Sequence, residues 1–591
     1  MRTTKYIFYL LITGCLLFPS LLHAQVPWSA PKTTTSVPED SLITVEILPG
    51  ARKLEFRKLN DSTQLQILAG NVKLKQGNTL FDCDSCVINN SANTFEAWGN
   101  VHINDSDTTN IYAGHLRYII NDKHAFLDGG VKLTDGKGSL TTPDLEYDVT
   151  TKIGIYKNGG KVINKKSILT SKEGYYYTDL KDVYFKYHVE LKDPAYSITT
   201  DSLLYNTETE STRFIAKTVI IDSNGRIIET SEGYYNQKTG KADFGSRPSI
   251  RDLKARTLIR ANHMEFDDSS HTSLAEGNVV YIDSTNNTTM LAGRMLRNNK
   301  TDAILATNKP LLIIKQDKDS IFITADTLFS ARLSDLHRNA DTVQTKDSLG
   351  RKDSVGKKDS LAVKDLKLRK DSIVIKDLKL QKDSLVYDTL KGRKVIALDN
   401  TKDSTNRYFE GYRNVRIFSD SLQAISDSLF YSFKDSIFKL FQHPVIWSKE
   451  SQITGDTVYL FTKNKKADRM KVFENSFLVN KSGPELFNQI SSTRLDAWFL
   501  DGSIDSARAK GYVSCIYFIQ DDDSAYTGIN ESTADMLDIY FEKDELKRVV
   551  FRSDVTGTLW PIRQKDPKTM RLPKFIWLEE KRPKTKFELF E

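Results

Sequence analysis

The sequence predicts an all-β protein, an elongated roll of two facing sheets. Short segments in which apolar residues alternate with polar ones recur along most of the chain. This alternation is typical of strands with one buried face. The segments repeat with a period of about 30 residues, and such a unit buries its apolar face only by stacking on copies of itself. We therefore expect a two-sheet β-solenoid built from these repeats.

The composition supports a folded chain and excludes several classes. The 591 residues include 84 Lys and Arg against 77 Asp and Glu, a formal net charge of +7. A hydrophobic share of 39% and an aromatic share of 10% suffice for a core and argue against bulk disorder. The charge is too small for a chain-wide nucleic-acid surface, and four cysteines do not make a disulfide scaffold.

Residues 1–24 have the pattern of an export signal. Two basic residues precede an apolar stretch over 6–22, and Ala24 provides a small residue at the cleavage position. A lipoprotein signal with Cys15 lipidated is the alternative, but the apolar stretch continues past Cys15. No later window has about 18 consecutive apolar residues, so we expect no transmembrane helix in the mature chain. Residues 25–57 form a lead segment before the repeats.

One repeated strand unit has the form Val-x-Leu, with Ile or Tyr replacing Leu in some copies. Its copies begin at Val72, Val101, Val131, Val189, Val219, Val279 and Val415, with weaker ones near Val162 and Ile250. The first three begin 29 and 30 residues apart. Gly or Asn usually precedes the valine, and polar residues such as Lys73 and His102 alternate with the apolar ones. Each copy is therefore expected to have one dry and one wet face.

A second unit, of the form Asp-x-Leu-x-Tyr or a near variant, follows about 16 residues after the first. Its copies include those at Leu116, Leu145, Leu203, Met264 and Leu429. Turn-forming runs such as 121–123 and 206–208 separate the two units. We expect each period to hold two short strands, one for each sheet, and to lengthen the roll by about 4.8 Å.

The repeats define two arrays, with regular spacing over 58–330 and looser spacing over 405–560. Between them, residues 331–404 contain Lys-Asp-Ser at positions 346, 352, 358, 370, 382 and 402. We interpret this low-complexity insert as a solvated linker or mobile loop, with a short β-helical extension as the alternative. The tail, 561–591, is basic and contains four prolines. It either docks on a partner or anionic surface, or covers the last open sheet edge.

No motif indicates catalysis. The nine histidines include no HExxH pair, and the chain has no GxSxG, P-loop or GxGxxG sequence. His102, His188 and His263 occupy repeat positions that hold other residue types elsewhere, which favours structural or surface roles. The acidic run 521–523 lacks the spaced ligands of a calcium loop. We therefore predict a non-enzymatic protein with no cofactor and no metal.

Cys83 and Cys86 have the spacing of a redox motif, but strand-type residues flank them. Residues three apart on a straight strand lie about 10 Å apart, which is beyond disulfide reach, so a local disulfide requires a turn. A local oxidised clip and two free thiols both remain open, and both are favoured over catalysis. Cys515 has no obvious partner in the sequence.

The repeats resemble those of a known family. Segments such as 68–74 (LAGNVKL), 97–103 (AWGNVHI), 275–281 (AEGNVVY) and 142–148 (TPDLEYD) are similar to the OstA-like repeats of the LptA family of periplasmic lipopolysaccharide-transport proteins. The resemblance is good over 58–330 and weaker over 405–560, and the insert and tail do not share it. This chain is much longer than a typical single-jellyroll bridge protein of the family, and its Lys-Asp-Ser insert is a further departure.

The resemblance implies a fold, a cargo and a compartment. The family fold is a β-jellyroll whose open, V-shaped cross-section holds lipid A acyl chains between two sheets. It implies a periplasmic protein of a gram-negative bacterium that shelters lipopolysaccharide during outer-membrane assembly, and it further implies association with the outer membrane. Implied partners are other transport components with jellyroll folds, joined end to end by strand pairing through exposed terminal rungs.

An apolar groove suits such a cargo. Exposing an acyl chain of 12 to 14 carbons to water costs roughly 10 kcal/mol, at about 0.8 kcal/mol per CH₂. The predicted groove-lining residues are Val72, Leu74, Val101, Ile103, Val131, Leu133, Leu145, Tyr147, Leu203, Tyr205, Val279 and Tyr281. The alternative is a structural or adhesive exported β-solenoid, in which the same residues close on each other as a dry core without lipid.

Overall fold

The computed structural model describes residues 44–60, 63–315, 320–336, 406–463, 466–521, 523 and 525–590. The expected export segment 1–24, residues 25–43 of the lead segment and residues 337–404 of the Lys-Asp-Ser insert lie outside these ranges.

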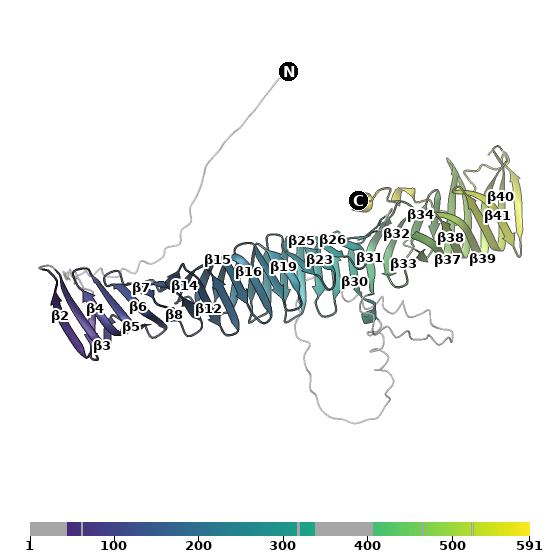
Figure 1. Ribbon diagram of the computed structural model, residues 1–591. Coiled ribbons are helices and arrows are strands. Elements are labelled where there is room, and N and C mark those ends of the chain that lie inside the picture. Colours follow the sequence, from purple (N-terminus) through teal and green to yellow (C-terminus); the bar gives the residue numbers. More distant parts are fainter. Residues whose placement is uncertain are drawn as a thin grey trace, which may run out of the picture.

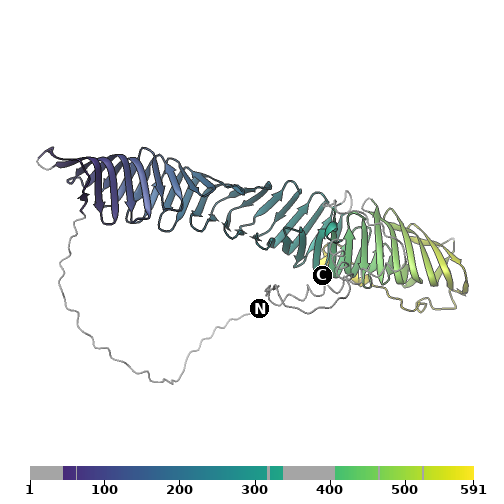
Figure 2. The same ribbon diagram turned by 90° about the horizontal axis from the view of Figure 1, so that it is seen from below.

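The described strands stack side by side into a long rod (Figure 1). Figure 2 shows the rod turned by 90°, with the strands running across its long axis from the first rungs to the last. All the pairings are antiparallel, and 42 strands join in one system in the described part of the chain. The predicted elongated all-β fold is confirmed. None of the described helices is long and apolar enough to cross a membrane.

The strand system folds into two facing layers because fourteen strands pass from one layer to the other. These crossing strands are β3 (Gln64–Gln76), β4 (Thr79–Asn89), β5 (Thr94–Asp105), β6 (Thr109–Ile119), β15 (Asp182–Lys192), β16 (Tyr196–Asn206), β25 (Thr272–Asp283), β26 (Thr288–Asn298), β31 (Arg407–Phe418), β32 (Gln423–Ser432), β37 (Lys466–Gly483), β38 (Leu486–Leu500), β39 (Ser503–Gln520) and β40 (Tyr526–Glu542). One part of each pairs in layer I and the other part in layer II.

Layer I is completed by short strands that come mostly in hairpins. These are β1 (Glu46–Leu48), β8 (Val131–Thr134), β9 (Ser139–Thr142), β12 (Gly160–Asn164), β13 (Ser167–Ser171), β18 (Thr218–Asp222), β19 (Arg226–Thr230), β22 (Ser249–Asp252), β23 (Thr257–Arg260), β28 (Leu311–Ile314), β29 (Ile321–Thr324), β34 (Val445–Ser448), β35 (Ser451–Thr454) and β42 (Thr556–Pro561).

Layer II is completed in the same way. Its short strands are β2 (Lys53–Lys58), β7 (His124–Asp128), β10 (Leu145–Asp148), β11 (Ile153–Tyr156), β14 (Glu173–Tyr177), β17 (Ser211–Phe214), β20 (Glu232–Asn236), β21 (Lys241–Gly245), β24 (His263–Asp267), β27 (Ala303–Thr307), β30 (Thr327–Arg332), β33 (Ile437–Phe441), β36 (Thr457–Lys463) and β41 (Glu545–Arg552).

The expectation of one strand per layer in each period was wrong, because each period adds a two-stranded hairpin to each layer. The hairpin β8–β9 lies in layer I and the next hairpin, β10–β11, lies in layer II. One period therefore lengthens the roll by about 9.6 Å, two strand spacings. The second strand of each hairpin, such as β9 or β11, lacks both repeated sequence units and was not recognised.

The Gly-Asn-Val sequences mark the crossovers between layers. At three of them the register shifts, between Ala69 and Val72, Trp98 and Val101, and Glu276 and Val279. The intervening Gly and Asn adopt positive φ, for example +77° at Gly99 and +46° at Asn100. A Cβ on Gly99 would lie 2.5 Å from the Asp84 Oδ2 atom, and glycine alone adopts this conformation without strain. The motif is therefore a bulge that redirects a strand from layer II into layer I.

All the crossovers lie along one long side of the roll, which we call the crossover margin. Along the other side, the turn margin, both layers end in hairpin turns such as 77–78 of layer I and 90–93 of layer II. In the ranges that the structure describes, the chain therefore joins the two layers covalently only at the crossover margin. At the turn margin, the described contacts between the layers are made by side chains.

The second repeat array continues the first without a break in strand pairing. Strand β31 pairs with β29 in layer I and with β30 in layer II. Asp302, in a layer II turn, accepts a hydrogen bond of 2.6 Å from Arg407 at the start of β31. Asp302 also lies 2.6 Å from the guanidinium of Arg297. The two arrays thus share one roll.

The tail runs back over the outer surface of layer I. Met570 and Leu572 pack against outward residues of β37, β39 and β40. Gln489 and Gln452, both buried, exchange hydrogen bonds with the backbone of the tail at 570–578. The short helix η4 (Glu588–Phe590) contacts β29 and β31. The other short helix of the tail, η3 (Glu579–Lys581), precedes it in the chain. The tail covers an outer sheet face and not the terminal edge.

Candidate functional site

The inner faces of the two layers form the strongest candidate site. All twelve residues predicted to line a groove are buried there, none more than 5% exposed. Ten of them, from Val72 to Tyr205, belong to one apolar cluster that extends from Leu68 to Phe244. Val279 and Tyr281 belong to a second cluster, from Ala261 to Ile539. We call these the first and second core clusters.

The interior is filled by the protein's own side chains. Aromatic rings meet across it, as where Phe81 packs edge-on to Phe95 with ring centroids 5.2 Å apart. Burial raises the pKa of interior tyrosines, that of Tyr156 to about 12 and that of Tyr281 to about 12. An apolar guest can therefore enter only if the layers move apart, and the turn margin is the side where they can separate.

A ladder of polar residues borders the turn margin. It occupies the ends of layer I strands at intervals of 29 to 31 residues and consists of Gln76, Asp105, Asp135, Asn164, Asp193, Asp222, Asp252 and Asp283. We call this set the margin ladder. None of these residues was predicted as part of a site, although the sequence has a recurring acid or amide at this one repeat position.

The first two members of the margin ladder bond to layer II. Tyr118 donates its hydroxyl to Gln76 Oε1 at 2.6 Å, and the Gln76 side chain donates to a layer II backbone carbonyl. Tyr147 donates to Asp105 Oδ2 at 2.8 Å. Lys152, from a layer II turn, forms an ion pair with the same carboxylate. Buried polar groups that satisfy each other in this way close the margin and fix the register of the two layers.

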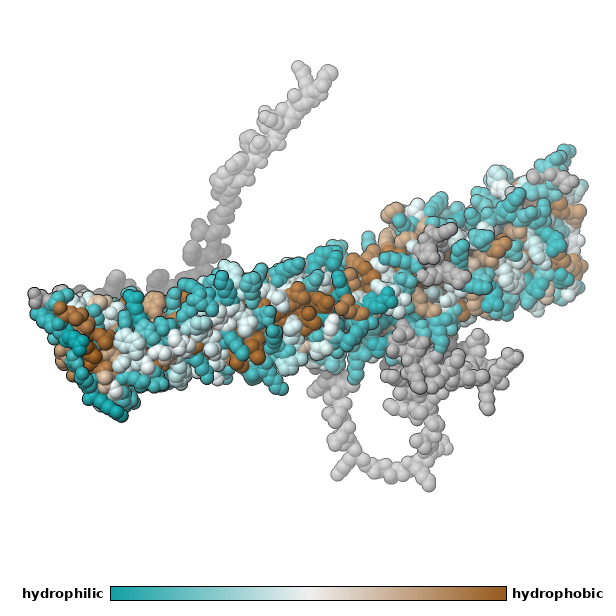
Figure 3. Space-filling view, viewed as in Figure 1, coloured by the Kyte–Doolittle hydropathy of each residue, from teal (hydrophilic) through white to brown (hydrophobic). Residues whose placement is uncertain are grey.

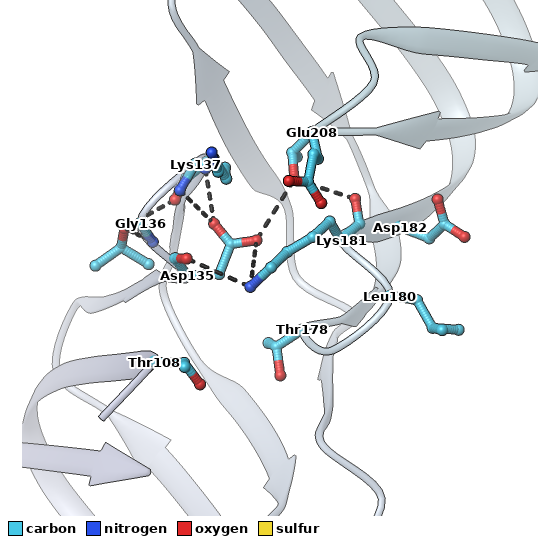
Figure 4. Close-up of polar contacts among 12 residues, drawn as sticks. Thr108, Asp135, Gly136, Lys137, Thr178, Leu180, Lys181, Asp182 and Glu208 are labelled. Atoms are coloured by element: carbon cyan, nitrogen blue, oxygen red, sulfur yellow. Dashed lines mark hydrogen bonds and ion pairs between the residues drawn. The ribbon is translucent and has the colours of Figure 1, made fainter. Parts of the chain in front are cut away.

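The next three members repeat the arrangement. Figure 4 shows Lys181 extending from a layer II turn to Asp135, with its Nζ atom 3.7 Å from Oδ2. Asn164 donates to the Tyr205 hydroxyl at 3.1 Å. Asp193 accepts a hydrogen bond of 2.9 Å from Gln237. From residue 76 to residue 193, every member of the ladder therefore contacts the opposite layer.

Asp222, Asp252 and Asp283 contact their own hairpins instead. Asp222 accepts a hydrogen bond of 2.6 Å from Arg226, on the adjacent strand of the same layer. Asp252 and Asp283 accept backbone N–H groups of their own turns, at 2.8 and 2.9 Å. The residue type is thus retained along the ladder, but the partner changes.

The other candidate groups are peripheral. Asp243, His263 and Glu265 are the only set of three metal-compatible residues in the described ranges. They lie on the outer face of layer II, where His263 Nε2 is 3.0 Å from Asp243 Oδ1. This is a hydrogen bond on the surface, with the Asp243 and Glu265 side chains largely exposed.

Cys83 and Cys86 both face the interior, because the register shifts between Asp82 and Ser85. This bulge provides the turn that a local disulfide between Cys83 and Cys86 would require. A hydrogen bond between the two thiols, together with burial, raises the pKa of Cys86 far above its ordinary value. Burial raises the pKa of Cys515 to about 12. Neither environment favours the thiolate that catalysis requires.

The comparison with known families agrees with this architecture. Residues 44–201 match the family model described as OstA-like protein. No curated protein matches the chain. The matched segment begins just before β1 and contains the first five members of the margin ladder.

Proposed function

We propose, from the place of this chain among OstA-like proteins, that it is a non-enzymatic periplasmic protein that binds and transports lipopolysaccharide. Its apolar interior would shelter lipid A acyl chains during outer-membrane assembly. The observation that supports this most directly is the asymmetry of the two margins. The layers are joined covalently on one side and by side-chain contacts on the other, which is the construction of a groove that opens.

The energies are compatible with opening. A hydrogen bond between neutral groups contributes about 1 kcal/mol to stability, and one to a charged group about 1.5 to 3 kcal/mol. Burying one acyl chain of 12 to 14 carbons gains roughly 10 kcal/mol. One chain can therefore offset the loss of several margin contacts, and the interior residues from Val72 to Tyr281 would then line the bound chain.

The test is site-specific crosslinking in cells. A photo-crosslinking residue is placed at Val131 or Leu145, both on the inner face, and separately at Lys132, which points outward from the same strand as Val131. We expect lipopolysaccharide adducts at the two inner positions and none at Lys132. Absence of adducts at both inner positions, in folded protein with active crosslinker, would refute lipid binding.

A structural β-solenoid with a dry core is the second candidate. The observation that favours it is the burial of the predicted lining residues, eleven of which are at most 1% exposed. It predicts that crosslinkers at Val131 and Leu145 capture only other parts of this chain. The same experiment therefore distinguishes the two functions.

We further propose that the ends of the roll pair with jellyroll partners. In the described residues, β1 and β2 pair only with β3, and β41 and β42 pair only with β40. The first edge exposes apolar side chains, with Phe56 60% exposed. Phe56→Asp is expected to weaken association with such partners. Leu500→Asp, at a leucine 64% exposed on a different part of the roll, is the matched control.

A further inference from the structure

The margin ladder changes partners near the middle of the roll. Each of the five members before Asp222 forms a hydrogen bond or ion pair with layer II. From Asp222 to Asp283, the hydrogen bonds of the ladder stay within layer I, and Asp252 also attracts the Arg297 guanidinium of layer II. The hydrogen-bonded closure between the layers therefore ends before Asp222.

The apolar interior is less completely buried at the same place. Where the first core cluster meets the second, five inward residues are only partly buried and pack against the cluster ends. The clusters still touch there, because the Phe244 and Phe266 ring centroids are 5.7 Å apart. These gap residues are Ile228, Tyr235, Ile250, Ile259 and Phe266. In the space-filling view of Figure 3, apolar surface gathers at mid-length, over the region that Figure 1 labels β19 and β23. Apolar side chains that stay in contact with water in this way indicate a binding surface.

A narrow crevice enters the roll between the gap residues. Ile250, Ile259 and Phe266 line it, together with the charged side chains of Arg226, Asp252 and Arg297. Its volume is about 30 Å³, room for about two water molecules. The crevice is thus a starting point for separating the layers and not a preformed acyl-chain pocket.

The turns beside the crevice are positively charged. Lys254 and Arg256 in the layer I turn and Lys300 in a layer II turn are exposed, and no ion pair is found for them in the described ranges. Leu253, between Asp252 and Lys254, is 61% exposed. An apolar crevice beside unpaired cations matches a molecule with an acyl chain and an anionic headgroup.

We propose that the gap over 222–299 is a lateral portal, where acyl chains enter or leave the groove while Lys254 and Arg256 hold the anionic headgroup at the rim. This proposal rests on the proposed function. The layers separate first at the portal because no hydrogen bond of the margin ladder joins them there. The chain then moves along the interior as successive ladder contacts open.

The test is a time course with full-length protein and purified lipopolysaccharide. Photo-crosslinking residues are placed at Ile259 in the portal, at Val131 in the closed part, and at Arg260, which points outward beside Ile259. We expect adducts at Ile259 first, adducts at Val131 later, and none at Arg260. Adducts at Val131 that precede those at Ile259, or adducts at Val131 alone, would refute the portal and leave the proposed function standing. No adduct at any position would refute both.

Headgroup recognition is tested by charge reversal. Lys254→Glu and Arg256→Glu should each lower the initial rate of adduct formation at Ile259 by about five-fold. Arg251→Glu makes the same charge change on the outer face of layer I and should leave the rate unchanged. With dephosphorylated lipopolysaccharide, the two portal variants should match the parent protein. Equal effects of all three substitutions, or an undiminished effect with the dephosphorylated lipid, would refute the role of these cations.

Discussion

Removing one hydroxyl group from the turn margin should loosen the roll locally. Tyr147→Phe deletes the donor to Asp105 and leaves the aromatic ring in the first core cluster. Asp105 keeps Lys152 and a hydrogen bond of 3.0 Å from Thr79, so the carboxylate is not left unpartnered. Loss of a hydrogen bond to a charged group then costs about 1.5 to 3 kcal/mol.

Hydrogen exchange measures this cost where it arises. Repeat proteins open locally, so the loss should appear in the strands around Tyr147 and not along the whole rod. At about 1.4 kcal/mol per factor of ten, amides of β10 and β11 should exchange roughly 10- to 150-fold faster. Strands of the second array, such as β33, should be unaffected.

Glu146→Gln provides the matched control, because Glu146 is the neighbouring residue on the same strand and points outward. Its ion pair with Lys157, at 3.3 Å, is exposed, and such pairs contribute about 0 to 1 kcal/mol. If Tyr147→Phe and Glu146→Gln accelerate exchange equally, the margin ladder does not hold the layers together. The account of how the groove closes would then be wrong.

Three further predictions concern stability. Because burial raises the pKa of Tyr156 to about 12, unfolding should become easier above pH 10, where only the unfolded chain ionises. The free energy of unfolding should fall by at most about 1.4 kcal/mol per pH unit for each such tyrosine. Urea unfolding at several pH values measures this fall, and unchanged unfolding midpoints would contradict it. Gly99→Ala should destabilise the first rungs by about 1 to 3 kcal/mol, because alanine is strained at this positive φ and its Cβ would clash with Asp84. Hydrogen exchange measures this loss. Gly77→Ala is the control, because Gly77 also has positive φ but has open space around it. Its loss of stability should be smaller, and an equal loss would show that the clash at Gly99 contributes nothing. Asp302→Asn should cost about 3 kcal/mol by urea unfolding because it leaves Arg407 buried and unpaired. The neighbouring arginines outweigh burial and lower the Asp302 pKa, so in the parent protein this contribution should be lost only as acid protonates Asp302. A variant as stable as the parent would refute the role of this pair.

The repeat sequence predicts the fold because its two signals, the alternation of apolar residues and the Gly-Asn pairs, have direct physical causes. Alternation places Val72 and Leu74 on one face of a strand, and the structure buries both. The Gly-Asn pair before Val72, Val101 and Val279 specifies positive φ, which few other residues adopt without cost. Whether the inner face receives a lipid does not follow from either signal, because a dry core requires the same apolar residues.

The hairpin partners and the margin contacts were not predictable in the same way. Strand β9 (Ser139–Thr142) is too short and polar to show alternation, and it is defined by its pairing with β8 and β12. Asp105 and Asp222 occupy the same repeat position, and the sequence does not distinguish their roles. The difference depends on residues about 42 to 47 positions further along, such as Tyr147 and Lys152 for Asp105.

The sizes of these energies determine where such a roll opens. Each closed rung of the margin ladder is held by about 1 to 3 kcal/mol, and five successive rungs from Gln76 to Asp193 are closed. Opening all five at once would cost up to about 15 kcal/mol, more than the roughly 10 kcal/mol gained from one acyl chain. One chain can therefore offset several rungs, but at the upper figure it cannot offset all five. Entry is favoured where no hydrogen-bonded rung holds the layers, and Ile250 and Ile259 lie at such a place. The same arithmetic predicts that deleting the Asp193 contact, by Gln237→Ala, lengthens the open stretch and speeds the appearance of adducts at Val131. Adducts that appear there no faster than in the parent protein would show that rung opening does not limit movement along the roll.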